Sequence, residues 1–316
     1  MRVADEGRPF GRPLVTALDR LSRSIPCGYT PGQRPATEPT ALACLALVAH
    51  GRPEAARRGV AWLASAQESN GHLPVRAAQG PGWATALGVL AACRLPPTGD
   101  GLGGEKGPAF DVDGAICWIL STRGEVQANG PIYGHDTTLA GWPWATPSHS
   151  WVEPTAMNLL ALKATGNGEH SRAREAVLLL VDRLLPGGGC NYGNVTVLGR
   201  ELRPQVAATG LALMALAGES DRDGRIGKSL DFLDARISAA TTAMSLAYGL
   251  MSLAAWGRAR PSDASLLATA LNRSMSGGSD STMNVALLCL AMSDSSNPFA
   301  LPAARLEIRK DGHSHA

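Results

Sequence analysis

The residues that could do chemistry are concentrated in one segment of the chain, residues 134–156, which reads GHDTTLAGWPWATPSHSWVEPTA. His135 and Asp136 stand side by side in it, and Glu153 follows just before a proline. A carboxyl group whose pKa is raised by a dry, aromatic surround can protonate an olefin or an epoxide. We therefore take Asp136, His135 and Glu153 as candidate catalytic residues, with Asp136 as the acid or polar anchor.

Aromatic and histidine side chains gather in and around the same segment, although the aromatic content of the whole chain is only 5%. Their π faces could hold a cationic intermediate or an apolar chain. In the alternative interpretation, the rings only cover one end of the fold with apolar area. The candidate substrate-binding residues are Tyr133, Trp142, Trp144, His149 and Trp151.

Structural roles compete with the catalytic ones. Asp136 and His135 could pin a loop through backbone hydrogen bonds, helped by the two threonines that follow them. Glu153 begins a Glu-Pro-Thr-Ala tetrapeptide that recurs at Glu38, and a carboxylate placed before a proline at a helix start can cap that helix. Both alternatives stay open at the level of the sequence.

Composition and charge narrow the class of ligand. The six cysteines are scattered without CxxC spacing, so we expect no metal site, no disulfide framework and no cofactor. A net charge of +2, with no cluster of Lys and Arg, argues against nucleic acid. The N-terminus lacks the apolar core of a signal peptide, and no apolar run suggests a transmembrane helix. These features predict a cytoplasmic protein without a transmembrane segment.

A repeated apolar segment must position the candidate residues. TALACLAL, rich in Ala and Leu, returns five times with variations, and amphipathic stretches lie between the copies. Repeats of this spacing are typical of stacked helical hairpins. The six copies begin at Thr40, Thr85, Thr155, Thr209, Thr242 and Val285. The amphipathic stretches are residues 55–67, 110–122, 171–185, 225–237 and 262–273.

The two helix types predict two layers. The repeated helices are apolar nearly all round and must be buried, whereas the amphipathic helices carry charge on one face that meets solvent. We therefore expect an all-α fold, an α/α toroid or barrel of about six inner and six outer helices. The inner helices are expected near residues 40–49, 84–93, 154–165, 205–217, 240–255 and 281–292. An open solenoid is the competing architecture, but it would need polar terminal repeats.

The segment with the candidate residues lies in an insertion. The stretch from Trp118 to Thr155 is 14 residues longer than the corresponding one from Trp62 to Thr85. The insertion therefore falls in an outer-to-inner connection, at the end where inner helices begin. Loops on a rigid scaffold often carry binding residues.

Three parts of the chain are distinguished by their patterns. Residues 1–36 form an N-terminal lead-in with one helix near residues 13–24 that packs on the outside, and residues 37–295 form the toroid domain. Residues 296–316 form a polar tail, and we assign no function to its His313 and His315.

The hairpin period, the Ala/Leu inner helices and the turns after the outer helices resemble the α/α-toroid superfamily of squalene-hopene cyclases and protein prenyltransferase β-subunits. The cyclase turn is the QW motif, Q-x-x-x-G-x-W. This chain has Gln67 and Gly71, with Leu73 where the Trp would stand, and a degenerate GGCNY at residues 188–192. The resemblance covers residues 37–292.

The activity motifs of these families are incomplete here. The nearest match to the cyclase D-x-D-D-T-A motif is Asp111-Val-Asp113-Gly, which lacks the last Asp and the Thr. Its position predicts that Asp111 and Asp113 cap an outer helix. No D-x-C sequence is present, so the zinc site of the prenyltransferases is not expected.

Two functions follow from the resemblance and the candidate residues. The first is a terpene-cyclase/prenyltransferase-like toroid that binds and transforms a hydrophobic isoprenoid in its central cavity by acid-initiated chemistry, as an isomerase or lyase. The alternative is a catalytically silent toroid that binds a hydrophobic ligand or a partner peptide. A closed cavity with one buried carboxylate would favour chemistry, and a filled or widely open centre would favour binding.

Overall fold

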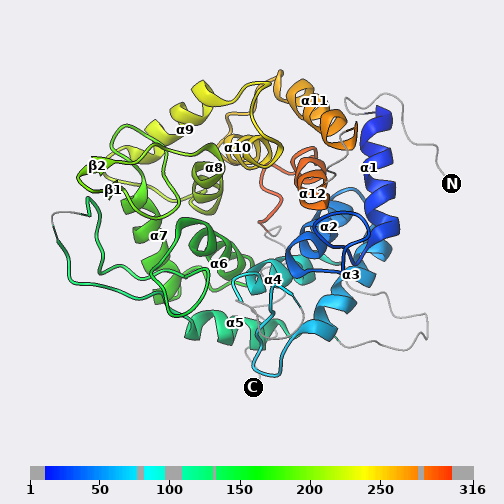
Figure 1. Cartoon of the computed structure of the whole chain (residues 1–316), viewed down its shortest axis with the longest axis horizontal. Helices are drawn as coiled ribbons and strands as arrows, with labels where there is room; N and C mark the ends of the chain where they lie inside the picture. Colours follow the sequence, from blue (N-terminus) through cyan, green and yellow to red (C-terminus); the bar gives the residue numbers. More distant parts are fainter. Residues whose placement is uncertain (1–10, 77–81, 97–108, 131–132, 277–280, 301–316) are drawn as a thin grey trace.

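The computed structural model describes residues 11–76, 82–96, 109–130, 133–276 and 281–300. Within these residues the chain is largely helical, with twelve helices and a single two-stranded hairpin. The even-numbered helices lie inside and the odd-numbered helices lie around them (Figure 1). The prediction of a largely helical chain is confirmed.

The even-numbered helices are the repeated apolar segments. Their first and last residues lie within a few residues of those predicted for the inner helices. They are α2 (Thr37–Ala49), α4 (Thr85–Arg94), α6 (Val152–Ala164), α8 (Val206–Ala215), α10 (Ala243–Ala255) and α12 (Thr282–Ala291).

These helices contact one another in a cyclic order. α2 packs against α4, α4 against α6, α6 against α8, α8 against α10, α10 against α12, and α12 against α2. α8 and α10 approach closely at Gly210, where an added Cβ would lie 2.7 Å from the backbone carbonyl of Tyr248. A side chain at this position would push the two helices apart.

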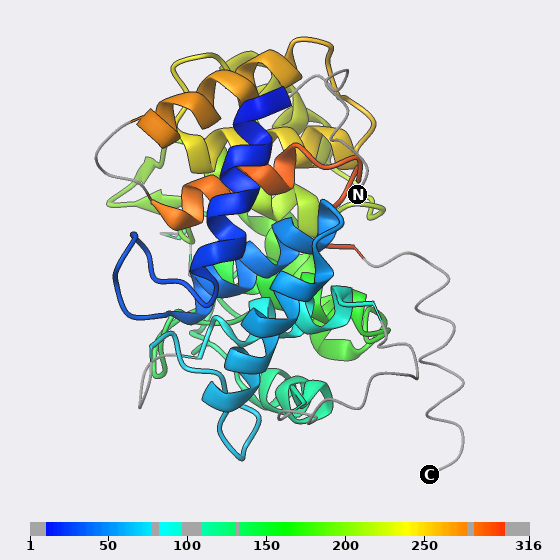
Figure 2. The same ribbon diagram turned by 90° about the vertical axis from the view of Figure 1, so that its right-hand side faces the viewer.

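The odd-numbered helices are amphipathic and form the outer layer. They are α1 (Gly11–Ser24), α3 (Pro53–Ala66), α5 (Val112–Ser121), α7 (Ser171–Arg183), α9 (Arg225–Arg236) and α11 (Asp263–Ser276). The lead-in helix α1 packs against α11, α12, α2 and α3, and Figure 2 shows it lying across the outside beside α11 and α12. The predicted N-cap of α5 is confirmed, because the Asp111 side chain accepts a hydrogen bond from the Gly114 amide at 2.9 Å.

A short hairpin interrupts the connection between α7 and α8. β1 (Thr196–Val197) pairs antiparallel with β2 (Arg200–Glu201), and Leu198 and Gly199 turn the chain with positive φ angles of 49° and 73°. Strands of two residues leave no alternating pattern in the sequence, so the hairpin was not predicted.

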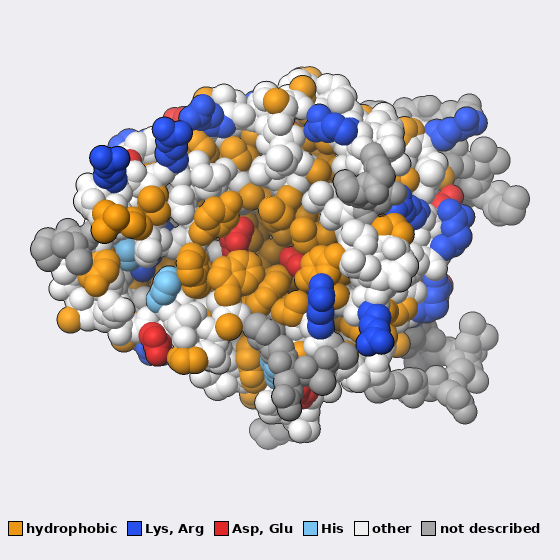
Figure 3. All heavy atoms as spheres, in the orientation of Figure 1, with side chains coloured by type: hydrophobic (Ala, Val, Ile, Leu, Met, Phe, Trp, Pro, Cys, Tyr) orange, Lys and Arg blue, Asp and Glu red, His pale blue; other side chains and the backbone are white. Residues whose placement is uncertain are grey.

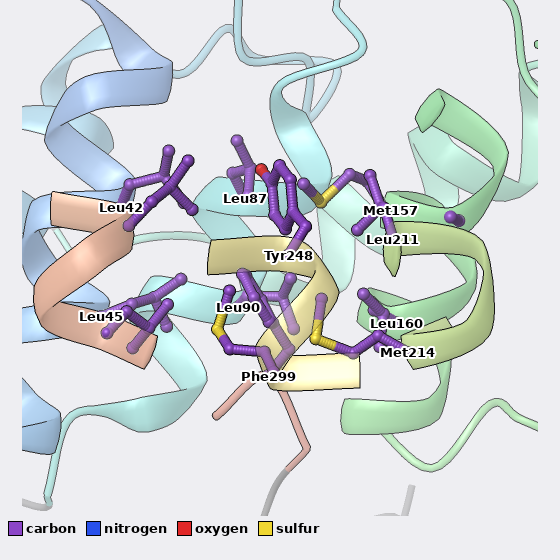
Figure 4. Close-up of a cluster of buried hydrophobic side chains, with 14 of the residues drawn as sticks. Leu42, Leu45, Leu87, Leu90, Met157, Leu160, Leu211, Met214, Tyr248 and Phe299 are labelled. Carbon is purple, nitrogen blue, oxygen red and sulfur yellow. The ribbon is translucent and has the colours of Figure 1, made fainter. Parts of the chain in front are cut away.

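Apolar side chains fill the interior between the even-numbered helices in two layers (Figure 4). The first layer surrounds Tyr248 and consists of Leu42, Leu87, Met157 and Leu211. The second layer surrounds Phe299 and consists of Leu45, Leu90, Leu160 and Met214. Phe299 follows α12 and is fully buried, although it lies in the segment assigned to the polar tail. Residues 301–316 of that tail lie outside the described residues, as do His313 and His315.

Two simple features complete the described chain. No disulfide bond joins any of the six cysteines in the described residues. Among the helices that can be described, none has the length and apolar character needed to cross a bilayer.

Replacing Phe299 tests its role in the core. Phe299→Ala removes a fully buried ring and leaves a cavity in the second layer, so the free energy of unfolding should fall by about 3–5 kcal/mol. Urea unfolding measures this, with Leu198→Ala as a control because Leu198 is 97% exposed. Equal stability of the Phe299→Ala protein and the wild type would contradict the packing described for this segment.

Candidate functional site in the central hollow

A hollow opens at the centre of the face shown in Figure 3, where hydrophobic side chains surround acidic ones. Glu38 lies in the first turn of α2 and Glu153 in the first turn of α6. Each precedes an inward side chain of the first core layer, Leu42 or Met157, by four residues. Residues four apart lie on the same face of a helix. Both carboxylates therefore point toward the common centre, and we call this region the central hollow.

The two glutamates differ from capping carboxylates. Both prolines that follow them lie in the first helical turn, where the missing N–H costs no hydrogen bond. The N-cap residues, Ala36 and Trp151, make no side-chain capping bond. No hydrogen bond of the Glu153 side chain is found among the described residues, whereas a capping carboxylate would accept one and have a lowered pKa. The capping interpretation is therefore wrong for Glu153.

Burial raises the pKa of both carboxyl groups. The pKa of Glu153 rises to about 7, because the group is desolvated and because the charge of Glu38 adds to that effect. Desolvation also raises the pKa of Glu38, and the Tyr29 hydroxyl beside it partly offsets the rise. At neutral pH the pair therefore holds a proton for part of the time.

Tyr248 brings a third titratable group to the same place. Its side chain is only 4% exposed and stands among the first-layer residues (Figure 4). Burial raises its pKa well above the ordinary value, and the charges of Glu38 and Glu153 raise it further. The Tyr248 hydroxyl on α10 therefore lies near the carboxylates of Glu38 on α2 and Glu153 on α6.

The rest of the central hollow is apolar. Met244 lies one helical turn before Tyr248 and is partly buried against the core, so it borders the hollow on the α10 side. Beneath Tyr248, the two layers of buried side chains fill the interior down to Phe299. The arrangement is a blind hollow with an apolar floor and two carboxylates in its wall.

Asp136 lies in a hydrogen-bonded turn against α7. Its Oδ1 accepts hydrogen bonds from the Thr138 amide at 2.8 Å and from the Thr138 hydroxyl at 2.6 Å. These bonds lower the pKa of Asp136, so the expectation of a raised pKa is wrong. The Asp136 amide donates to the Asp182 carboxylate at 3.0 Å, and its carbonyl accepts from Arg183 at 3.2 Å. These contacts support the loop-pinning alternative.

Three other candidates line a small pocket beside the inserted segment. Tyr133, His135 and His149 share it with the nearly buried Arg183, and its volume is about 220 Å³. His135 Nδ1 accepts a hydrogen bond from the Val195 amide at 3.4 Å. Burial lowers the pKa of His135, and the charge of Arg183 lowers it further. The Asp136 carboxylate is not among the groups that line this pocket.

The three tryptophans of the inserted segment do not form one aromatic cage. Trp144 meets Trp83 edge to face, with ring centroids 4.7 Å apart. Trp151 stacks on His149 at 4.5 Å and directly precedes α6. Trp142 is 1% exposed, and the guanidinium of Arg172 lies 4.3 Å from its ring centroid. One face of Trp142 is therefore already occupied by a cation.

Trp142 holds a repeated structural position. Its amide donates to the Thr155 hydroxyl at 3.0 Å, as the Leu73 amide does to Thr85 at 3.0 Å and the Cys190 amide to Thr209 at 2.9 Å. The Cys27 amide donates to Thr40 in the same way at 3.1 Å. A threonine in the first turn of each of these four helices therefore fastens the loop before it. Trp142 serves this scaffold, whatever the rest of the insertion does.

Sequence reasoning missed Glu38, Tyr29 and Tyr248. The signal for Glu38 was present, because it lies one helical turn before an inward leucine, as Glu153 lies before an inward methionine. Tyr29 and Tyr248 left no signal, because only the packing of α10 and of the segment before α2 brings them to the glutamates.

Comparison with known proteins adds no family. No family model matches the chain, and no curated protein matches it at a significant level. No group of three or more His, Cys, Asp and Glu side chains with the geometry of a metal site occurs in the part of the chain that the structure describes. The functional argument therefore depends on the central hollow itself.

The raised pKa of Glu153 predicts how stability depends on pH. The unfolded chain loses this proton near the ordinary value of 4.5 and the folded chain near 7, so between these values the folded state binds more protons. The free energy of unfolding should therefore fall as the pH rises through this window, by on the order of 1–3 kcal/mol from Glu153. Urea unfolding of the wild type and Glu153→Gln should diverge with rising pH, with the variant more stable above about pH 7. A difference that does not change with pH would contradict the burial of Glu153.

The hydrogen bonds of Asp136 predict a modest structural role. Asp136→Asn removes the charged acceptor of the Thr138 amide and hydroxyl, and should lower the free energy of unfolding by about 1 kcal/mol. Thr138→Ala disrupts the same interaction, so the double variant should lose less than the sum of the two single losses. Full additivity would show that the two residues act separately.

Proposed function

We propose that this chain is an α/α toroid that binds a hydrophobic small molecule, of the isoprenoid class, in the central hollow. The cyclic contacts of the even-numbered helices and the surrounding layer of odd-numbered helices support the architecture (Figure 1). The resemblance to the cyclase and prenyltransferase toroids supplies the expectation of an isoprenoid.

The observation that carries the proposal is the composition of the hollow. Its floor and rim are formed by Tyr248, Met244 and the first core layer, and its polar groups are few and convergent. Small-molecule sites combine a concave apolar surface with a small number of placed polar groups. Because the interior below the floor is packed, the hollow suits a ligand that enters from one face.

Acid-initiated chemistry is the second candidate, and the raised pKa of Glu153 favours it. A carboxyl group with a pKa of about 7 carries its proton for part of the time at neutral pH and can then act as a general acid. Such a group is a weak acid for protonating an alkene. An epoxide oxygen accepts a proton more readily than an alkene does. Of the acid-initiated reactions, epoxide opening is therefore the one that Glu153 could catalyse.

Calorimetric titration with farnesol tests the binding proposal. The wild type should bind this isoprenoid alcohol at one site per chain. Met244→Trp fills the hollow at its rim and should abolish binding, whereas Leu178→Trp should not, because Leu178 is 60% exposed on the outer helix α7. Absence of binding to the wild type, or equal loss in both variants, would overturn the proposal.

The same protein can be incubated with the terminal epoxide of farnesol to test the second candidate. A cyclised or opened product that forms with the wild type and not with Glu153→Gln would establish acid chemistry. Unchanged epoxide, with farnesol binding retained, would assign the hollow to binding alone.

A further inference from the structure

The two acidic groups of the central hollow have no basic side chain beside them among the described residues. Several acidic side chains elsewhere do pair with basic ones, as Glu54 does with Arg57 at 3.3 Å and Glu219 with Lys163 at 2.8 Å. Neither Glu38 nor Glu153 forms an ion pair within the described residues. The hollow therefore places two carboxyl groups in an apolar surround without a basic partner among the described residues.

A hydroxyl group at the floor of the hollow also lacks a partner among the described residues. The Tyr248 hydroxyl makes no hydrogen bond within the described chain, although the side chain is only 4% exposed. Figure 4 shows the ring standing in the first core layer. The charges of Glu38 and Glu153 both raise the pKa of this hydroxyl, as expected for a group near both carboxylates. An unpaired hydroxyl at the floor of a hollow can accept a hydrogen bond from a bound molecule or donate one to it.

Arg76, which lies beside Tyr29, does not neutralise the two carboxylates. Arg76 is exposed and its guanidinium lies 5.5 Å from the centroid of the Tyr29 ring. Its charge lowers the pKa of Tyr29 and is not among the causes that act on Glu38 or Glu153. The charge of Arg76 therefore does not compensate the charge of Glu38 or Glu153.

We propose that the ligand of the central hollow is an amphiphilic amine, whose ammonium group lies between Glu38 and Glu153 and whose apolar body covers Met244 and the first core layer. The assignment rests on the proposed function of the hollow as a site for a hydrophobic molecule. An ammonium group supplies three donors, enough for the two carboxylates and the Tyr248 hydroxyl oxygen. The ring of Tyr248 adds a π surface that attracts a cation.

The same charges exclude another class of isoprenoid. A diphosphate group brought into the hollow would face two carboxylates, with no ion-pairing Lys or Arg beside them in the described part of the chain, and like charges in a desolvated site repel strongly. Isoprenyl diphosphates should therefore not bind, even though their apolar bodies would fit as well as that of the amine.

Three probes with one hydrocarbon body test the inference: farnesylamine, farnesol and farnesyl diphosphate. At about pH 8, Glu153 is mostly ionised while an alkyl ammonium keeps its proton. Calorimetric titration of the wild type should give at least roughly tenfold tighter binding of the amine than of the alcohol, because charge-assisted hydrogen bonds exceed neutral ones. The diphosphate should give no binding.

Two charge variants separate the site from general attraction. The preference for the amine should disappear in Glu38→Gln/Glu153→Gln, with binding of farnesol retained. It should persist in Glu169→Gln, which removes a carboxylate on a side chain that is 92% exposed. Thermal melting confirms folding, and the double variant should be at least as stable as the wild type because it no longer buries charge.

The outcomes distinguish this inference from the proposed function. Equal affinity of the wild type for the amine and the alcohol would overturn the inference and leave the site for hydrophobic molecules intact. Amine preference that survives in Glu38→Gln/Glu153→Gln would overturn it as well. Absence of binding of all three probes would overturn the proposed function together with the inference.

Discussion

The complete burial of the even-numbered helices is the constraint on which the rest of the structure depends. These helices are apolar on nearly every face, so each must be covered on all sides. Contacts with two inner neighbours cover its flanks and an amphipathic helix covers its outer side. The remaining stripe of each helix faces its counterparts, and the layers around Tyr248 and Phe299 fill the space between them.

Two carboxylates depart from this apolar design at one place. Glu38 and Glu153 lie on the inward faces of α2 and α6, one helical turn before Leu42 and Met157. They therefore stand above the first core layer, where the interior is no longer filled by apolar side chains. Burial raises their pKa values, which means that the free energy of unfolding is lower when the two groups are ionised than when they are protonated. A structural benefit that offsets this cost is not evident in their contacts. The proposed amine would neutralise them.

The helices could be predicted from the sequence, and the candidate residues only in part. Periodicity gave the helix positions because burial of a whole helix leaves a long, redundant pattern, and Asp111 was recognised as an N-cap from its local context. Asp136 was interpreted as the acid of the site because the His-Asp pair occurs only once in the repeat. In the structure, the Asp136 carboxylate instead accepts hydrogen bonds from Thr138 in its own turn. The Glu-Pro-Thr-Ala sequence occurs at both Glu38 and Glu153, which suggested a structural role in starting the helices. Their proximity is set by tertiary packing of segments far apart in the chain, which no local pattern encodes.

The central claim is that Glu38 and Glu153 share one apolar hollow, and a pH titration of the side-chain carboxyl carbons by carbon-13 NMR tests it most directly. Assignments come from the Glu38→Gln and Glu153→Gln proteins. The account predicts that Glu153 titrates near pH 7 in the wild type and at lower pH in Glu38→Gln, because the neighbouring charge is gone. Titration of Glu153 near 4.5, unchanged by Glu38→Gln, would contradict it.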